Sequence, residues 1–238
     1  AEIFKPQSAT DANKNVLEPV VGYNIETGVK SEFLGDALNT AVALFQIIQE
    51  NRAITDPNNS NYSIAEGKVR SRGIDAEISG SITERWSVMA GYTFNKSEYL
   101  KSERKTSSNV DYNKGADAKK YIPRHMFKLY TSYEIPLVGT QKLSIGTGVR
   151  YQSKTSGIYM KDNMSSGSAI SYYVPEQKGY ALWDANINYL INDNFSVGLI
   201  VKNITDKKYF YNTHNRTAGM NNFYGEPRSF MLSFNYKY

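Results

Sequence analysis

The chain has 238 residues, of which 40 % are hydrophobic, and a formal net charge of +5 at pH 7. It contains no cysteine, which excludes disulfides, thiolate metal sites and a cysteine nucleophile. Lys and Arg are scattered among Asp and Glu, so the positive excess forms no basic surface, and we expect no nucleic-acid partner.

The chain is polar on average, with a mean hydropathy of -0.52. No apolar run reaches the roughly 18 residues that a membrane-spanning helix needs. The first residues, AEIFKPQ, lack the basic and apolar segments of a signal peptide. We therefore expect that a leader was removed or that the chain is part of a longer protein.

The predicted elements are β-strands, because apolar and polar residues alternate with a period of two in one stretch after another. A partial strand at 1–7 opens the series, and about ten strands are expected in all. The segment 38–49 (LNTAVALFQIIQ) could form a helix, but its neighbours favour a strand. In each of the clearest strands, alternate positions are mostly apolar, and we call this set of positions the apolar parity of the strand. In chain order it consists of Val21, Tyr23, Ile25, Thr27, Val29 and Phe33; Ile74, Ala76, Ile78 and Ile82; Trp86, Val88, Ala90, Tyr92 and Phe94; Phe127, Leu129, Thr131, Tyr133 and Ile135; Leu143, Ile145, Thr147, Val149 and Tyr151; Trp183, Ala185, Ile187, Tyr189 and Ile191; Phe195, Val197, Leu199 and Val201; and Phe230, Leu232, Phe234, Tyr236 and Tyr238.

The connections between these strands alternate in length. Short turns are expected at Leu34–Ala37, Thr83–Arg85, Pro136–Lys142 and Asn192–Asn194. Long polar loops are expected at 8–18, 51–67, 99–121, 153–179 and 206–223. Long loops confined to every second connection lie on one rim of the sheet, as they do in outer-membrane barrels.

A transmembrane antiparallel β-barrel and a soluble β-sandwich both show this alternation. The predicted strands run to about 10–14 residues, which is enough to cross a bilayer when tilted. Sandwich strands average about 5–6 residues. Aromatic residues also gather near the short turns, at Phe33, Trp86, Phe195 and Tyr238, as in an interfacial girdle. The membrane barrel is therefore the preferred interpretation.

Two C-terminal stretches carry the most specific patterns, LIVKNITDKKY at 199–209 and YGEPRSFMLSFNYKY at 224–238. The first resembles the penultimate-strand signature of the TonB-dependent outer-membrane receptors for ferric siderophores. The second resembles the closing Gly-x-Pro-Arg segment and aromatic last strand of that family, although Tyr238 stands where phenylalanine is commoner. Earlier stretches, including YIPRHMFKLYTSYEI and EPVVGYNIETGVKSEF, match internal strand patterns of the family, so the resemblance covers essentially the whole chain.

The resemblance implies an all-β fold, a barrel of about 22 strands plugged by an N-terminal domain. Residues 1–238 would then be the C-terminal part of the barrel, about ten strands, with no plug domain in this chain. It also implies a receptor in the bacterial outer membrane that takes up a ferric siderophore. The implied partners are the siderophore, outer-membrane lipid and lipopolysaccharide, and the TonB energy-coupling complex, reached through the missing N-terminal part.

Several alternatives remain at this point. A receptor of the same architecture could carry cobalamin, haem or a glycan instead. A ten-stranded outer-membrane protease would need Asp and His at the barrel mouth to activate water, but His125 and His214 are the only histidines, and no carboxylate motif accompanies His214. No enzyme activity is therefore expected. A soluble β-sandwich adhesion module is disfavoured by strand length.

The expected ligand carries its iron already wrapped in oxygen ligands, so neither a protein-bound cofactor nor protein metal ligands are predicted. Such a ligand needs aromatic faces and polar donors around a wide mouth. Inward charges, namely Asp75, Glu77, Lys128, Arg150 and Lys202, are expected to hydrate the lumen or pair with the plug. The candidate ligand-binding residues all lie in the long loops and are Tyr112, Tyr159, Tyr172, Tyr173, Tyr211, Arg216 and Phe223.

The last strand also predicts which face meets lipid. Phe230, Leu232, Phe234, Tyr236 and Tyr238 are expected to point outward, and Met231, Ser233, Asn235 and Lys237 toward the lumen. A register slip of one residue would reverse both faces.

Overall fold

The computed structural model describes residues 2–59, 61–102, 114–118, 121–156, 160–162, 171–173, 176–212 and 223–238, without the side chains of residues 3, 160–162, 171–173 and 212. Every regular element in these ranges is a β-strand, which confirms the predicted all-β fold and the strand at 38–49. The strands are β1 (Glu2–Lys5), β2 (Val20–Phe33), β3 (Leu38–Thr55), β4 (Ser63–Thr83), β5 (Trp86–Lys101), β6 (His125–Pro136), β7 (Lys142–Gln152), β8 (Thr155–Ser156), β9 (Met160–Asp162), β10 (Ser171–Tyr173), β11 (Glu176–Gln177), β12 (Tyr180–Asn192), β13 (Phe195–Lys202), β14 (Phe210–Asn212), β15 (Phe223–Tyr224) and β16 (Ser229–Tyr236).

Ten of these strands form one sheet in the order β1-β2-β3-β4-β5-β6-β7-β12-β13-β16. The order follows the chain, and the six remaining short strands pair as β8 with β11, β9 with β10 and β14 with β15. The prediction of about ten strands, with a partial one at the N-terminus, is confirmed. The sheet is not closed within this chain.

The chain divides into two compact units. The first comprises Ala1–Gly28, Ala43–Asp75 and Phe94–Lys119, and the second comprises Val29–Val42, Ala76–Thr93 and Lys120–Tyr238. The first unit therefore holds β1 and the loop-side parts of β2 to β5. The second holds their turn-side parts and all later strands, and each unit is described separately below.

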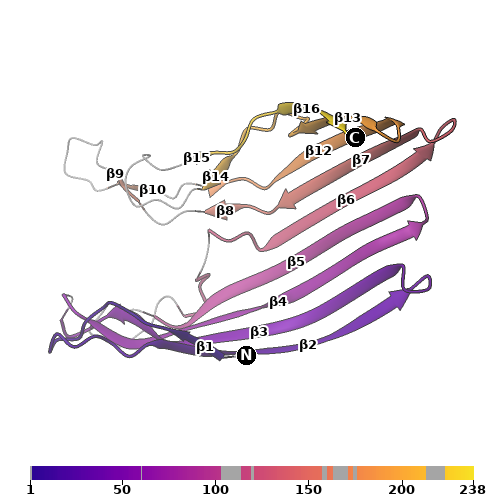
Figure 1. Ribbon diagram of the computed structural model, residues 1–238. Helices are drawn as coiled ribbons and strands as arrows, with labels where there is room; N and C mark the ends of the chain where they lie inside the picture. Colours follow the sequence, from indigo (N-terminus) through magenta and orange to yellow (C-terminus); the bar gives the residue numbers. More distant parts are fainter. Residues whose placement is uncertain are drawn as a thin grey trace. The chain divides into compact units, whose positions relative to one another are not determined.

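The alternation of short and long connections is confirmed in the second unit. The short turns cover residues 34–37, 84–85, 137–141 and 193–194, and they lie together at one end of the strands in Figure 1. In the turn at Glu84 and Arg85, the Thr83 hydroxyl accepts hydrogen bonds from the backbone N–H groups of Arg85 and Trp86 at 3.3 and 3.1 Å. A Thr or Ser side chain that bonds the following backbone in this way stabilises a turn.

The predicted boundaries of one loop are wrong. Residues 51–67 were expected to form a long polar loop, but β3 continues to Thr55 and β4 begins at Ser63. The polar segment stays in strand form because another part of the first unit supplies hydrogen bonds: Gln7 accepts from the backbone N–H of Ala53 at 2.9 Å and donates to the carbonyl of Asn51 at 2.6 Å. Polarity alone therefore did not distinguish a loop from an extended hairpin.

Strand length also differs from the expected 10–14 residues at both extremes. β4 has 21 residues and β3 has 18, whereas β13 and β16 have 8 each. β13 ends at Lys202, and the next residue, Asn203, leaves the extended region for a left-handed backbone conformation with φ of 49°.

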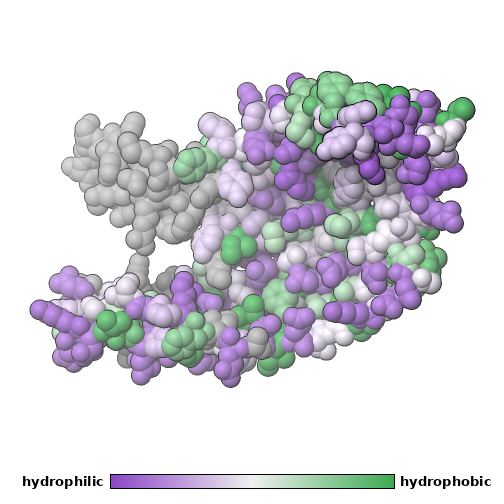
Figure 2. Space-filling view, in the orientation of Figure 1, coloured by the Kyte–Doolittle hydropathy of each residue, from purple (hydrophilic) through white to green (hydrophobic). Residues whose placement is uncertain are grey.

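The register in the second unit brings the apolar parities of neighbouring strands onto one face. On β13 and β16, Phe195, Val197, Leu199 and Val201 lie opposite Tyr236, Phe234, Leu232 and Phe230. β12 continues the same pattern, with Ile187 opposite both Leu199 and Ile145. The apolar residues of the last strand thus share a face with those of β13, and hydrophobic side chains gather over β13 and β16 in Figure 2. That this face meets lipid stays a prediction.

The apolar face is exposed, whereas a soluble sandwich would bury it. The side chains of Phe230, Phe234 and Tyr236 are 68, 64 and 71 % exposed. The small buried cluster of the second unit, Tyr180, Leu182 and Tyr209, lies instead at the loop end of the strands. Within the described ranges, no helix has the length and apolarity needed to cross a membrane.

Candidate ligand site at the loop ends

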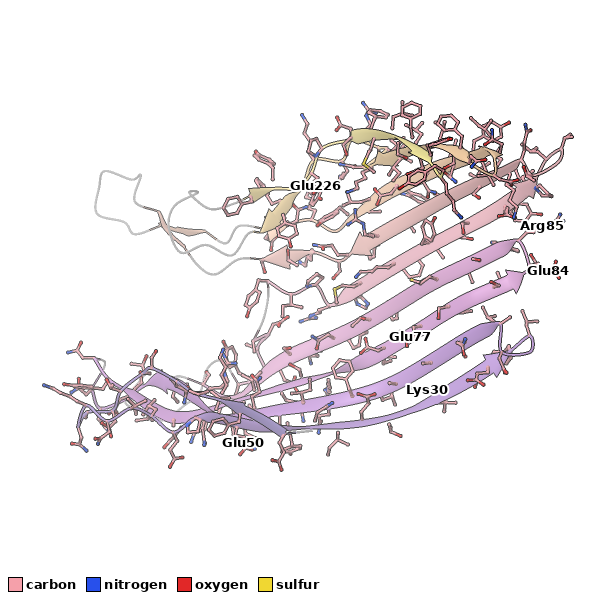
Figure 3. All side chains as sticks on the ribbon, viewed as in Figure 1. Lys30, Glu50, Glu77, Glu84, Arg85 and Glu226 are labelled. Atoms are coloured by element: carbon pink, nitrogen blue, oxygen red, sulfur yellow. The ribbon has the colours of Figure 1, made fainter. Side chains whose placement is uncertain are left out.

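A pocket of about 370 Å³ lies in the second unit where the strands pass into the long loops. Arg150 of β7 and Lys202 of β13 contribute two cations to its wall, and Leu182 of β12 contributes an apolar surface. Tyr211 and Phe223 come from the last long connection. Figure 3 shows Glu226, which also lines the pocket, at the end of the strands opposite Glu84 and Arg85 of the short turn.

The strand wall of the pocket belongs to the polar parity. Leu182 and Arg150 are register partners on β12 and β7. Lys202 has the parity opposite to Val201, Leu199 and Val197 on β13. Because successive strand residues point to opposite faces, these side chains lie on the face opposite the apolar one. The pocket therefore faces the side that was predicted to be the lumen.

The NITDKKY segment forms a tight turn organised by Asn203, which is only 3 % exposed. Its side-chain oxygen accepts a hydrogen bond from the backbone N–H of Lys207 at 2.8 Å. Its side-chain nitrogen donates to the carbonyls of Lys207 and Glu226, each at 3.0 Å. Asp206 extends the link by accepting from the backbone N–H of Arg228 at 3.2 Å. The two C-terminal motifs are therefore joined by hydrogen bonds, which positions the approach to β16.

Aromatic packing reinforces this junction. The rings of Tyr209 and Tyr180 are 4.5 Å apart, and those of Phe210 and Tyr224 are 4.7 Å apart. A Cβ atom placed on Gly225 would overlap the Tyr209 ring, so only glycine fits there without displacement. The Gly-x-Pro-Arg glycine and the tyrosine of the other motif thus form one packed contact.

One carboxylate, that of Asp184, holds a cation of the pocket wall in place. Arg150 donates to Asp184 Oδ2 at 3.1 Å, and Asp184 Oδ1 accepts the backbone N–H of Asn203 at 2.8 Å. Lys202 adds a second cation to the wall and Glu226 a second carboxylate, so the two cations are matched by Asp184 and Glu226. Trp183 is the aromatic residue nearest the loops on the apolar face of β12, and Tyr180 lies farther toward the loops than Trp183 does. Burial, with a smaller contribution from Tyr209, raises the pKa of Tyr180 to about 12, so its phenol stays protonated at neutral pH.

The structure brings together two of the predicted ligand residues. Tyr211 and Phe223 line the same pocket and are 78 and 62 % exposed. Tyr172 and Tyr173 lie on β10, opposite Lys161 and Met160 of β9, and their side chains are not among those described. Tyr112, Tyr159 and Arg216 lie outside the described residues, as does His214. Ligand contact by any of the seven remains a prediction.

Sequence reasoning missed the structural residues of the site. Asn203, Asp206 and Gly225 were recognised only as letters of a family pattern, and their mutual contacts give that pattern its physical basis. Arg150 and Lys202, which were expected to hydrate the lumen or pair with the plug, line the pocket on the predicted lumen side, and their role there stays a prediction. His125 accepts or donates a hydrogen bond with the Tyr92 hydroxyl at 2.8 Å. Among the described side chains, no cluster of three or more His, Cys, Asp or Glu residues could hold a metal ion.

The sheet and site define a class of protein, a β-barrel protein of the outer membrane. A family model described as TonB dependent receptor-like, beta-barrel matches residues 1–204. The ferric-pyoverdine receptor PbuA of a Pseudomonas species is 35 % identical over 237 residues, which cover 98 % of this chain and 26 % of that protein. The chain belongs to the TonB-dependent receptor-like β-barrel family, whose members are receptors of the Gram-negative outer membrane.

Solved structures agree with this assignment. The pyoverdine outer-membrane receptor of Pseudomonas aeruginosa, bound to pyoverdine, has a TM-score of 0.83 and 31 % identity, covering 100 % of this chain and 33 % of that one. The ferric-catecholate import receptor of Escherichia coli has a TM-score of 0.73 and 26 % identity, covering 98 % and 30 %. The chain thus spans about a quarter of the length of PbuA and about a third of these solved chains.

Proposed function

We propose that this chain is the C-terminal part of the barrel of an outer-membrane receptor that takes up a ferric siderophore. The observation that carries the proposal is the loop-end pocket, where aromatic side chains meet the cations Arg150 and Lys202 on the polar face of the sheet. A ferric siderophore is a large chelate with polar oxygen atoms around the iron and flat or peptidic parts beyond it. Aromatic surfaces and cationic donors suit both features.

Relatives support the same ligand class. PbuA is a ferric-pyoverdine receptor, the Pseudomonas aeruginosa receptor is bound to pyoverdine, and the Escherichia coli receptor imports ferric catecholates. Loops determine the ligand in such scaffolds, because they vary while the strands position them. Residues 1–238 would be about ten strands of a larger plugged barrel. Outer-membrane lipid and lipopolysaccharide would surround that barrel, and the TonB energy-coupling complex would act through a part outside this chain.

The iron is cargo in this proposal, and the chain supplies no ligand to it. Arg150 and Lys202 would attract the negatively charged chelate, while Tyr211 and Phe223 would pack against its flat parts. The pocket wall is prearranged, since Asp184 holds Arg150 and the Asn203 turn fixes the entry to the loop. A preorganised wall loses less conformational freedom on binding.

The test is ligand affinity in the full-length receptor, measured with purified ferric pyoverdine, ferric catecholate, haem and cobalamin as separate probes. Replacing Tyr211 or Phe223 with Ala should weaken binding of the preferred iron chelate by about tenfold, which corresponds to about 1.4 kcal/mol. Tyr236→Ala is the matched control, because Tyr236 is equally exposed but lies at the turn end of β16.

The outcomes separate the alternatives. Unchanged affinity in both loop variants, or an equal loss in Tyr236→Ala, would remove the pocket from the ligand site. Binding of haem or cobalamin without any iron chelate would replace the ligand class and leave the architecture standing.

A further inference from the structure

Two of the long connections in the second unit have short β-stems at their bases. The connection between β7 and β12 has the stem β8–β11, which ends at Gln177. The connection between β13 and β16 has the stem β14–β15, in which Phe210 pairs with Tyr224 (Figure 1). Tyr211 and Phe223, the two exposed aromatic residues of the loop-end pocket, both belong to the second stem. The shape of this stem therefore decides where the aromatic wall of the pocket stands.

Tyr211 lies at a bulge in the second stem. Phe210 pairs with Tyr224 and Asn212 pairs with Phe223, so Tyr211 is an extra residue between the two pairs. A bulge leaves one residue unpaired and changes the direction of its side chain relative to the regular strand. The direction of the Tyr211 side chain therefore depends on how firmly the adjacent backbone is held.

The backbone that precedes the bulge is held by the other connection. The Tyr209 carbonyl accepts a hydrogen bond from the Gly225 N–H at 2.8 Å. Because a carbonyl and the N–H of the next residue point to opposite edges of a strand, the Phe210 N–H points away from β15. It donates to Gln177 Oε1 at 2.9 Å. A hydrogen bond thus joins the two stems at the residue directly before Tyr211.

The Gln177 amide is itself fixed in this orientation. The residue is only 8 % exposed, and its Nε2 donates to the carbonyl of Lys178 at 2.7 Å, which leaves Oε1 toward Phe210. The ring of Phe210 is held separately, 4.7 Å from the ring of Tyr224. A partly buried backbone N–H without a partner is costly, so loss of the Gln177 acceptor should displace the Phe210 backbone.

We propose that Gln177 is a positioning residue of the ligand site, which sets the direction of the bulged Tyr211 through the backbone of Phe210. Gln177 does not line the pocket, so it acts on the ligand through Tyr211. The connection between β7 and β12 thus contributes to affinity through a residue that does not touch the ligand. This role rests on the proposed function, because Tyr211 contributes to affinity only where the loop-end pocket binds the chelate.

The test measures the affinity and the dissociation rate of purified ferric pyoverdine and of a purified ferric catecholate on the full-length receptor. Gln177→Met keeps the length of the side chain and removes the amide. It should weaken binding of the preferred chelate by about three- to tenfold, the equivalent of one hydrogen bond. The loss should appear as faster dissociation, because the aromatic wall is loosened while the approach of the ligand is unchanged.

Thr155→Val is the matched control for this variant. Thr155 is the register partner of Gln177 in the same stem and is 7 % exposed, and valine has nearly the same shape as threonine. Because the Thr155 side chain does not bond the β14–β15 stem, its substitution should leave the affinity and the dissociation rate unchanged.

A double variant separates positioning from general damage to the fold. In the Tyr211→Ala receptor there is no ring left to position, so adding Gln177→Met should weaken binding by less than about twofold more. A residue that only stabilised the fold would lower the affinity by the same factor with and without the Tyr211 ring.

Hydrogen exchange of the ligand-free receptor tests the contact between the stems. The amides of Phe210 and Tyr211 should exchange faster in Gln177→Met than in the native receptor, because opening of this segment no longer breaks the bond to Gln177. Thr155→Val should leave their exchange unchanged.

The outcomes distinguish this role from the proposed function. If the native receptor binds a chelate and Gln177→Met loses no more affinity than Thr155→Val, the role of Gln177 is overturned and the proposed function stands. The same holds if Gln177→Met has an equal effect with and without the Tyr211 ring, or if exchange at Phe210 and Tyr211 is unchanged. A native receptor that binds neither iron chelate would overturn the proposed function and this role with it.

Discussion

Asn203→Ala, at a buried turn position, should destabilise the receptor more than the truncation of an asparagine at an exposed strand position does. The native side chain makes three hydrogen bonds of 2.8 to 3.0 Å, to the backbone of Lys207 and Glu226. At about 1 kcal/mol for each bond, their loss costs roughly 3 kcal/mol. The backbone φ of 49° adds about 1 kcal/mol, because Ala tolerates the left-handed region less well than Asn.

The assay is guanidinium unfolding of the full-length receptor in defined bilayers or detergent. Asn235→Ala is the matched control, since Asn235 is exposed on β16 and should change the free energy of unfolding by less than about 0.5 kcal/mol. A cost for Asn203→Ala no larger than that of the control would refute the view that this residue joins the two C-terminal motifs.

Three other substitutions test separate parts of the structure. Phe234→Arg should cost about 2–4 kcal/mol because it places a cation in lipid, whereas Ser233→Arg on the opposite parity should cost much less. Gly225→Ala should lower the free energy of unfolding by about 1–3 kcal/mol through overlap with the Tyr209 ring. A double variant that also removes that ring should lose less free energy of unfolding than the two single variants lose together. Glu98→Gln should lower stability at pH 7 and become neutral in acid, because hydrogen bonds from Arg70 and Lys96 lower the pKa of Glu98. The stabilisation is fully present above the ordinary value of 4.5 and is lost as the pH falls through the lower pKa of the folded state.

Each expectation has a contrary result. A larger cost for Ser233→Arg than for Phe234→Arg would mean that the two faces of the sheet are reversed. If the losses in free energy of unfolding for the Gly225 and Tyr209 substitutions add strictly, the two positions are not in steric contact. The stability of Glu98→Gln could differ from that of the native receptor by the same amount from pH 7 to about 3. That result would show that ion pairing of Glu98 with its cationic partners does not stabilise the fold.

Much of the fold was predictable because the alternation of apolar and polar residues in a membrane strand is visible in its local sequence. Alternation at 195–201 and 230–236 sets the face, and the register of β13 with β16 follows from it. The limits of the strands were less predictable. β3 and β4 extend through polar residues because Gln7 supplies hydrogen bonds from a distant segment, and β13 stops where Asn203 leaves the strand conformation. Neither effect has a signature in the local sequence.

The candidate site was predictable only in part, for a related reason. The aromatic loop residues Tyr211 and Phe223 were identifiable by type, since exposed aromatic residues in loops suit ligand contact. Their meeting with Arg150 and Lys202 depends on contacts between strands far apart in the sequence. The grouping of Arg70, Arg72 and Lys96 around Glu98 was not predicted, because the three cations are scattered along the chain. They come together only when β4 and β5 pair, which places both strands' charged ends around Glu98.

The most direct measurement is uptake of radiolabelled iron chelates by bacteria that lack their own siderophore receptors and carry the full-length protein. The account predicts that iron from at least one ferric siderophore accumulates, and that accumulation stops when the inner membrane is de-energised. Uptake of haem, cobalamin or a glycan with no accumulation of iron from any chelate would contradict the assignment to siderophore transport.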